Sequence, residues 1–166
     1  MNKNEIVDKA LKLQGYNFKF NSKPLIIGGL AMEYYGLRKR GQDIDLVITN
    51  DDYIDLSKKY PNNKKDIWGD LGIVVNSFEI WRSIALLDYY FYAEGSIEYS
   101  DYKVVSFDRL FFMRALAMEV EKYKNDFELM KQHLLKRQPI DFKEYQNKHI
   151  EKYKSVTGGV IFNDEY

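Results

Sequence analysis

Apolar and polar positions alternate along the first part of the chain in a way that predicts a small α/β arrangement. Apolar side chains recur at helical spacing over residues 4–15, which indicates an amphipathic helix. Residues 25–27 form a short apolar run that ends at Gly28-Gly29, as a buried strand does where it enters a turn. A short helical pattern follows. Residues 43–48 then alternate acidic and apolar side chains, which predicts a strand, and residues 52–59 predict a helix. This β-α-β-α order favours a mixed sheet covered by helices.

The rest of the chain divides into a strand-rich part and a helical part. Residues 67–105 contain short apolar runs separated by turn residues, and the longest run, residues 83–92, has a single acid, Asp88, near its middle. A helical pattern begins after Ser106 and continues to residue 135, and a final amphipathic helix is predicted beyond Pro139. We therefore predict an α/β core over residues 1–106, a helical portion over residues 107–155 packed on that core, and a tail over residues 156–166.

Composition excludes several classes of chemistry. The 166 residues include no cysteine, which excludes disulfides, thiol catalysis and cysteine-based zinc sites. The two histidines, His133 and His149, both lie in the predicted C-terminal helices, so we expect neither a histidine metal site nor a Ser-His triad. With 25 basic and 25 acidic residues the chain has no overall basic field to attract nucleic acid. No apolar run approaches membrane-spanning length and the N-terminus has no signal-peptide core, so we expect a cytoplasmic protein without a membrane partner.

Asp43 and Asp45 are the first candidate site. Alternate residues of a strand share a face, so the two carboxylates point the same way while Ile44 and Leu46 point into a core. Like charges placed so close repel each other, and a divalent cation removes that repulsion. Mg²⁺ prefers hard oxygen ligands and often combines one or two carboxylates with substrate phosphates. The alternative is a solvent-exposed strand face or a turn with Asx capping.

Gly28-Gly29 and a basic cluster flank this acidic pair in sequence. Glycine allows a positive φ and a close approach of a ligand to the backbone, and a glycine turn that opens a helix presents unpaired N–H groups to a phosphate. The alternative is a plain strand-to-helix turn. Arg38, Lys39 and Arg40 lie between the glycines and the acids, where they contact a triphosphate or a nucleic-acid backbone, or else form a solvated loop.

The order of these features (apolar strand, Gly-Gly, helix, basic loop, Asp-Ile-Asp in a strand) resembles the DNA polymerase β-like nucleotidyltransferase superfamily. The segment GGLAMEYYGLRKRGQDIDLVI is most similar to the minimal and AbiEii-like nucleotidyltransferases, several of which are toxins of toxin–antitoxin pairs. The resemblance is specific over residues 24–50 and continues more loosely to about residue 135. It implies an α/β (α+β) nucleotidyltransferase fold with a small mixed sheet, flanking helices and a C-terminal helical portion.

The same resemblance implies the ligands. Two Mg²⁺ ions would be held by three carboxylates, a nucleoside triphosphate would be the substrate, and the acceptor would be an RNA such as tRNA, a protein or a small-molecule hydroxyl. A cognate antitoxin would be a partner. Asp43 and Asp45 match the first two carboxylates, and Asp88 is the position matched to the third, with Glu79 as the rival.

The helical part carries the remaining expectations. Arg114 stands where the family has a lysine, and the segment KYKNDFELM supplies Lys124 and Asp126. The resemblance implies that Arg114 and Lys124, with the basic cluster, offset the charge of the triphosphate, and that Asp126 orients or deprotonates the acceptor. The alternative for all three residues is a charged helix face with i, i+4 pairs.

Two other functions stay open from the sequence. Arg114 and Asn125 depart from the family pattern, so the fold could serve as a catalytically inactive binding or regulatory module. In a third interpretation the protein is an interaction protein and the acidic pair is a surface turn. One observation separates this last interpretation from the other two: whether Asp43 and Asp45 face Gly28-Gly29 across a cleft.

Overall fold

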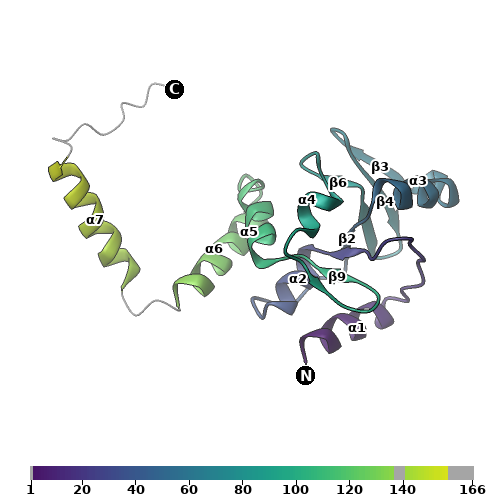
Figure 1. The fold of residues 1–166 in the computed structure, drawn as a ribbon, viewed down its shortest axis with the longest axis horizontal. Helices are drawn as coiled ribbons and strands as arrows, with labels where there is room; N and C mark the ends of the chain where they lie inside the picture. The colour runs from purple at the N-terminus through teal and green to yellow at the C-terminus, as the bar shows by residue number, and fades with distance from the viewer. Residues whose placement is uncertain (1, 137–140, 157–166) are drawn as a thin grey trace. The chain divides into compact units, whose positions relative to one another are not determined.

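A seven-stranded mixed sheet forms the centre of residues 1–127, and helices of the same part of the chain pack beside it (Figure 1). The computed structural model describes residues 2–136 and 141–156. The strands lie in the order β3-β4-β5-β2-β1-β9-β8. Their bounds are Leu25–Ile26 (β1), Ile44–Val47 (β2), Lys64–Ile67 (β3), Asp70–Val75 (β4), Phe78–Trp81 (β5), Ile97–Glu98 (β8) and Lys103–Val104 (β9). β2 runs antiparallel to β1 and parallel to β5, so the sheet is mixed as predicted.

Seven α-helices lie within the described residues, which confirms the mixed helix-and-strand class. Their bounds are Lys3–Leu13 (α1), Gly28–Tyr34 (α2), Asn50–Lys59 (α3), Tyr89–Ala93 (α4), Phe107–Ala115 (α5), Glu121–Leu135 (α6) and Phe142–Val156 (α7), with a 3-10 turn at Pro61–Asn63. Side chains cap the starts of several helices by accepting a backbone N–H: Thr49 at α3, Asp88 at α4 and Ser106 at α5. Within the described ranges, no helix is long and apolar enough to cross a bilayer.

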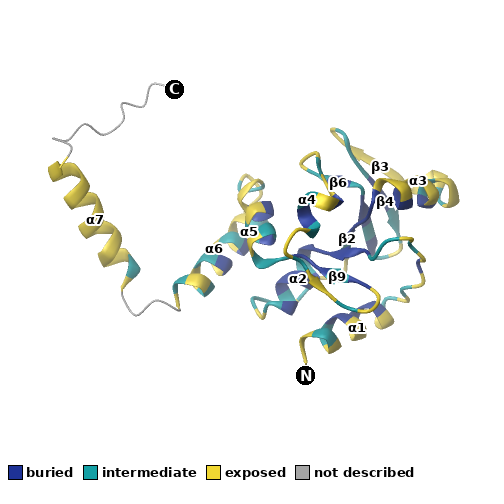
Figure 2. Cartoon of the chain, viewed as in Figure 1, coloured by how far each residue is buried: buried dark blue, intermediate teal, exposed yellow. Residues whose placement is uncertain are grey.

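The core lies along the central strands. Leu25, Ile26, Ile44, Leu46 and Ile80 are completely buried, and β2 is dark blue in Figure 2. Burial of each such side chain contributes about 1.5–3 kcal/mol to folding. Because β2 alternates, burying Ile44 and Leu46 leaves Asp45 on the opposite face, where the site lies.

The apolar run at residues 83–92 does not form one long strand. It makes a short hairpin of β6 (Ser83–Ile84) and β7 (Leu87–Asp88), and Asp88 then caps α4. The two-residue turn between the strands places Ala85 and Leu86 at φ 51° and 62°. Asp70 stabilises this turn by accepting hydrogen bonds from both of their N–H groups, at 2.6 and 2.8 Å.

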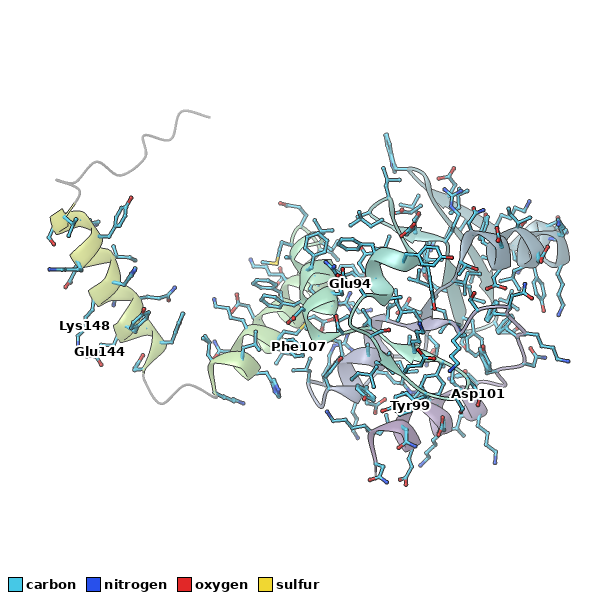
Figure 3. The ribbon with its side chains drawn as sticks, in the orientation of Figure 1. Glu94, Tyr99, Asp101, Phe107, Glu144 and Lys148 are labelled. Carbon is cyan, nitrogen blue, oxygen red and sulfur yellow. The ribbon has the colours of Figure 1, made fainter. Side chains whose placement is uncertain are left out.

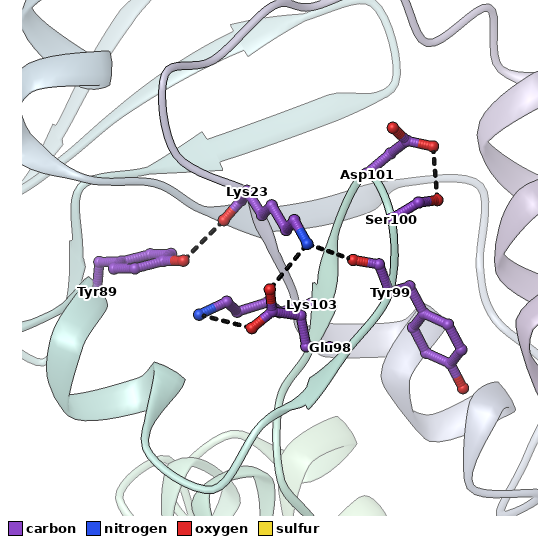
Figure 4. Close-up of polar contacts among 7 residues, drawn as sticks. All are labelled: Lys23, Tyr89, Glu98, Tyr99, Ser100, Asp101 and Lys103. Atoms are coloured by element: carbon purple, nitrogen blue, oxygen red, sulfur yellow. Dashed lines mark hydrogen bonds and ion pairs between the residues drawn. The ribbon is translucent and has the colours of Figure 1, made fainter.

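Polar contacts connect the ends of the sheet to the rest of the fold. Lys23 donates to Glu98 at 2.8 Å and to the carbonyl of Tyr99 at 2.7 Å, which fixes the β8–β9 edge beside the start of β1 (Figure 4). Tyr89 of α4 donates to the carbonyl of Lys23 at 2.8 Å (Figure 4). Glu94, after α4, forms an ion pair with Arg109 of α5.

The chain divides into two compact units, residues 1–127 and residues 128–166. The first unit therefore includes α5 and the first half of α6, and the predicted boundary at residue 106 lies within it. The reason is that α5 buries Leu110, Met113 and Arg114. In the second unit, α7 has no buried residue and has an i, i+4 pair between Glu144 and Lys148 (Figure 3). The predicted tail lies outside the described residues except for Val156.

Candidate active site

Gly28 and Asp45 come together because β1 and β2 pair directly. Ile26 is opposite Leu46, and the N–H of Ile27 donates to the carbonyl of Asp45 at 3.1 Å. The chain then turns at Gly28, whose φ is 60°, to start α2. A Cβ on Gly28 would overlap the carboxylate of Asp45. Glycine at this position is therefore required both by the backbone conformation and by the close approach of the acid.

The Gly28-Gly29 turn does not present all its N–H groups to solvent. Burial of Asp45 raises the pKa of its carboxyl group, and the backbone N–H of Gly29, which faces that carboxylate, opposes the rise. That the turn also binds a phosphate stays a prediction.

A cavity of about 310 Å³ opens beside this turn. Its walls combine carboxylates, cationic groups and an apolar surface. They are formed by Ile27, Gly28, Gly29, Arg38, Gly41, Asp43, Asp45, Ile67, Asp70, Glu79, Trp81, Ile84, Met113, Arg114, Ala117, Lys122 and Tyr123. All of these residues belong to the first compact unit. The structure thus places Asp43 and Asp45 together with the Gly28-Gly29 turn in the lining of one cavity, with Asp45 in strand β2.

Three carboxylates gather around the end of β2. Asp43 lies just before the strand and is exposed, while Asp45 is half-buried. Glu79 is the register partner of Asp45 on the parallel strand β5. Burial raises the pKa of Asp45, and the charge of Glu79 raises it further. The guanidinium of Arg114 and the ammonium of Lys122 oppose this shift.

Hard carboxylate oxygens of this kind fit Mg²⁺, since the charge of the acids is only partly offset by the chain itself. Among the described residues, however, no group of three histidine, cysteine or acidic side chains is already arranged to hold a metal. A bound Mg²⁺ would therefore take part of its coordination from phosphate oxygens or water, as this ion commonly does.

Asp88 is not the third acid. It is exposed, and its carboxylate accepts the N–H of Phe91 at 3.0 Å as the cap of α4. It lines a different hollow, together with Asn50 and Arg82. The prediction failed because the second half of its apolar run is a helix, so Asp88 ends a two-residue strand. Glu79, the rival candidate, is the acid beside Asp45.

Asp126 contacts the two arginines that line the cavity, Arg38 and Arg114. Its side chain is 3% exposed and accepts Arg38 through two nitrogens, Nε at 2.5 Å and Nη2 at 2.8 Å. Nε of Arg114 lies 3.1 Å from its Oδ2. The hydrogen bond with Asp126 raises the pKa of Arg38, while burial lowers the pKa of Arg114. Asp126 is thus absent from the cavity lining, and both arginines are present in it.

The other predicted basic residues do not reach the cavity. Lys39 and Lys124 are exposed and do not line it. Arg40 pairs with Glu33 at 3.5 Å. Lys122 lines the cavity in place of Lys124. It lies one helical turn before Asp126, and this i, i+4 spacing was the available signal that the two residues share a face.

Asp70 and Trp81 also line the cavity and were not predicted. Both follow from strand pairing, which joins residues distant in sequence. Asp70 accepts Ser83 Oγ at 2.8 Å in addition to the two turn amides, so it has a structural role. Trp81, 6% exposed, lies under the ammonium of Lys65 at 5.2 Å.

Comparisons with protein-family models, with curated proteins and with solved structures each returned no match.

Proposed function

We propose that this chain is a Mg²⁺-dependent nucleotidyltransferase. It would transfer a nucleoside monophosphate from a nucleoside triphosphate to a hydroxyl group of an RNA such as tRNA, a protein or a small molecule. The observation that carries the proposal is the placement of Asp43 and Asp45 in one cavity with the Gly28-Gly29 turn and with Arg38 and Arg114. The resemblance over residues 24–50 supports it independently of the geometry.

The residues divide into two functional sides. Asp43, Asp45 and Glu79 are the carboxylates that would hold Mg²⁺. When bound, this ion neutralises charge on the triphosphate and on the departing pyrophosphate. Arg38 and Arg114 offset the remaining phosphate charge from the other side of the cavity. This arrangement suits a transfer in which the acceptor oxygen bonds to the α-phosphorus as the bond to pyrophosphate breaks.

The apolar part of the cavity lining is the reason for proposing a nucleotide, and not inorganic phosphate, as the ligand. Ile67, Trp81 and Ile84 line it beside the acids. A mixture of an apolar wall and a few placed polar groups is typical of sites for small organic ligands. A base or ribose would cover this wall while the phosphates contact the arginines.

The test incubates purified protein with Mg²⁺ and each labelled nucleoside triphosphate in the presence of cellular RNA and protein. We expect label transfer by the wild type, and loss of transfer by about two orders of magnitude or more in Asp43→Asn, because the acid acts on charge that develops in the transition state. Asp101→Asn is the matched control, since Asp101 is an exposed acid on the distant β8–β9 loop (Figure 4). No transfer by the wild type, or equal transfer by both variants, would overturn the proposal.

The toxin role rests on the resemblance alone. If it holds, expression of the wild type should arrest growth while expression of Asp43→Asn should not. Growth arrest by both proteins would show that any toxicity is independent of transfer.

A binding or regulatory module is the second candidate. It is favoured by the position of Asp126, whose carboxylate is held between two arginines and does not line the cavity. This candidate predicts that Mg²⁺ does not increase the affinity for nucleoside triphosphates. A calorimetric titration that shows such an increase would exclude it.

A further inference from the structure

Asp126 is almost completely buried, yet it is not isolated from charge. The residue is 2% exposed, and its two oxygens face the guanidinium groups of Arg38 and Arg114. Arg38 comes from the loop after α2 and Arg114 from α5, whereas Asp126 belongs to α6. One carboxylate therefore connects three separate segments of the first compact unit.

Arg38 is held in a fixed orientation. Its Nε and Nη2 form a two-pronged contact with Asp126, and its Nη1 donates to the carbonyl of Lys39 at 3.0 Å. The same Nη1 lies 3.7 Å from the point where a Cβ of Gly29 would be. The guanidinium thus lies beside the glycine turn with N–H groups left over, because an arginine has five.

Arg114 is buried but incompletely paired. It is 5% exposed and lies over the ring of Tyr123 at 4.7 Å. Its Nε makes no hydrogen bond within the described residues, although Asp126 Oδ2 is 3.1 Å away. That nitrogen faces Asp126 in an ion pair, so any contact of Arg114 with a ligand in the cavity falls to its two terminal nitrogens, each of which carries two N–H groups.

Two guanidinium groups this close repel each other, and a single carboxylate between them removes part of that repulsion. It does not remove all of it, since the pair carries two positive charges and Asp126 carries one negative charge. The surplus charge is presented at the cavity, where Lys122 adds to it. An anion with several oxygens is the ligand that such a forked cationic surface fits.

We propose that Asp126 is a positioning residue that holds Arg38 and Arg114 as a preassembled clamp for the polyphosphate of a nucleotide. The identification of the ligand as a nucleotide rests on the proposed function, but the clamp itself requires only a polyphosphate. Asp126 acts through the arginines and does not take the proton of the acceptor, because both of its oxygens are occupied by cations.

The test titrates inorganic pyrophosphate into the full-length protein in EDTA and follows binding by calorimetry. We expect wild-type binding and an affinity about ten-fold lower for Asp126→Asn, since the arginines lose their shared anchor. Asp126→Glu should recover part of the loss because it restores the carboxylate. Glu121→Gln is the control, as it removes one exposed acid from the same helix and should bind like the wild type.

Loss of a buried ion-pair partner is strongly destabilising, so Asp126→Asn can fail to fold for reasons unrelated to the ligand. A second variant that leaves the charges of the site unchanged is therefore needed. Arg38→Lys keeps the positive charge but loses the two-pronged geometry. We expect about ten-fold weaker pyrophosphate binding for this variant with a melting temperature near that of the wild type. If Asp126→Asn does not fold, Arg38→Lys decides the question.

Kinetics separate positioning from proton transfer. If Asp126 only positions the arginines, Asp126→Asn should mainly raise KM for the nucleoside triphosphate, and the pH dependence of kcat should be the same as in the wild type. For a proton acceptor it would lower kcat and remove one limb of that profile. No pyrophosphate binding by the wild type, or unchanged binding by folded Asp126→Asn and by Arg38→Lys, would overturn the clamp. Pyrophosphate binding without label transfer would instead refute only the proposed enzymatic function.

Discussion

Gly28→Ala is the sharpest perturbation of the site, because it adds one methyl group at the closest approach between the turn and the acids. The backbone of Gly28 has φ 60°, a conformation that disfavours any side chain. The added Cβ would also overlap the carboxylate of Asp45. The substitution therefore imposes two separate penalties, one on the backbone and one on the acid.

Gly36 allows the two penalties to be separated. Its φ is 72°, and a Cβ there would have no atom within 4 Å, so Gly36→Ala carries the backbone strain alone, about 1–2 kcal/mol. In Gly28→Ala the carboxylate of Asp45 must also move and lose the N–H of Gly29. A hydrogen bond to a charged group contributes about 1.5–3 kcal/mol. We thus expect a loss of about 2.5–5 kcal/mol in the free energy of unfolding for Gly28→Ala.

Urea unfolding at neutral pH measures these differences. In an Asp45→Ala background, Gly28→Ala should lose about 1.5 kcal/mol less than in the wild type, because the carboxylate is gone. Gly29→Ala has only ordinary contacts, the nearest at 3.5 Å, and should be tolerated. Equal losses for Gly28→Ala and Gly36→Ala, with no coupling to Asp45, would refute the close approach on which the site depends.

Three further predictions test the surroundings of the site. Burial and Glu79 raise the pKa of Asp45 above its ordinary 3.8, so its ionised form opposes folding. Asp45→Asn should therefore raise the urea midpoint at pH 7, and the gain should vanish as the pH falls toward 3.8. Ala85→Gly relieves a φ of 51° and should raise the free energy of unfolding by about 0.5–1 kcal/mol in thermal melts; a decrease would contradict the strained turn. Trp68→Phe removes the tryptophan that is 96% exposed and leaves Trp81, whose emission should be blue-shifted and should change on adding nucleotide; no change at saturation would place the ligand elsewhere.

The features that the sequence predicted well depend on near neighbours in the chain. Alternation predicts that two acids two residues apart share a strand face. Asp45 lies in β2 but Asp43 lies just before it, outside the strand, and both still line the cavity. The glycine turn was equally local. These features gave the centre of the site and its facing partners before any pairing of distant strands was known.

The predictions that failed concern features that depend on the pairing of strands distant in sequence, or on where a helix or strand ends. The apolar run containing Asp88 has no period that distinguishes a buried strand from a helix, so its helical second half was not evident. Glu79 meets Asp45 only because β5 pairs in parallel with β2 in one particular register. A shift of that register by one residue would turn Glu79 to the other face and bring a core residue to the cavity.

The cavity separates its charges into two sides, and neither side is balanced. Acids come from β2, β4, β5 and the residue before β2, whereas cations come from α5, α6 and the loop after α2. Arg114 and Lys122 lower the pKa of Asp45, but burial and Glu79 outweigh them and the pKa stays raised. Glu79 also pairs with Lys65 at 3.7 Å, whereas Asp45 keeps its raised pKa, and on the other side two arginines share the single carboxylate of Asp126. A nucleoside triphosphate bound with Mg²⁺ presents a cation and an anion joined in one ligand, which is the complement of this divided surface. Neither a metal alone nor a phosphate alone would satisfy both sides, and for this reason the proposed function assigns a metal–nucleotide complex to the cavity.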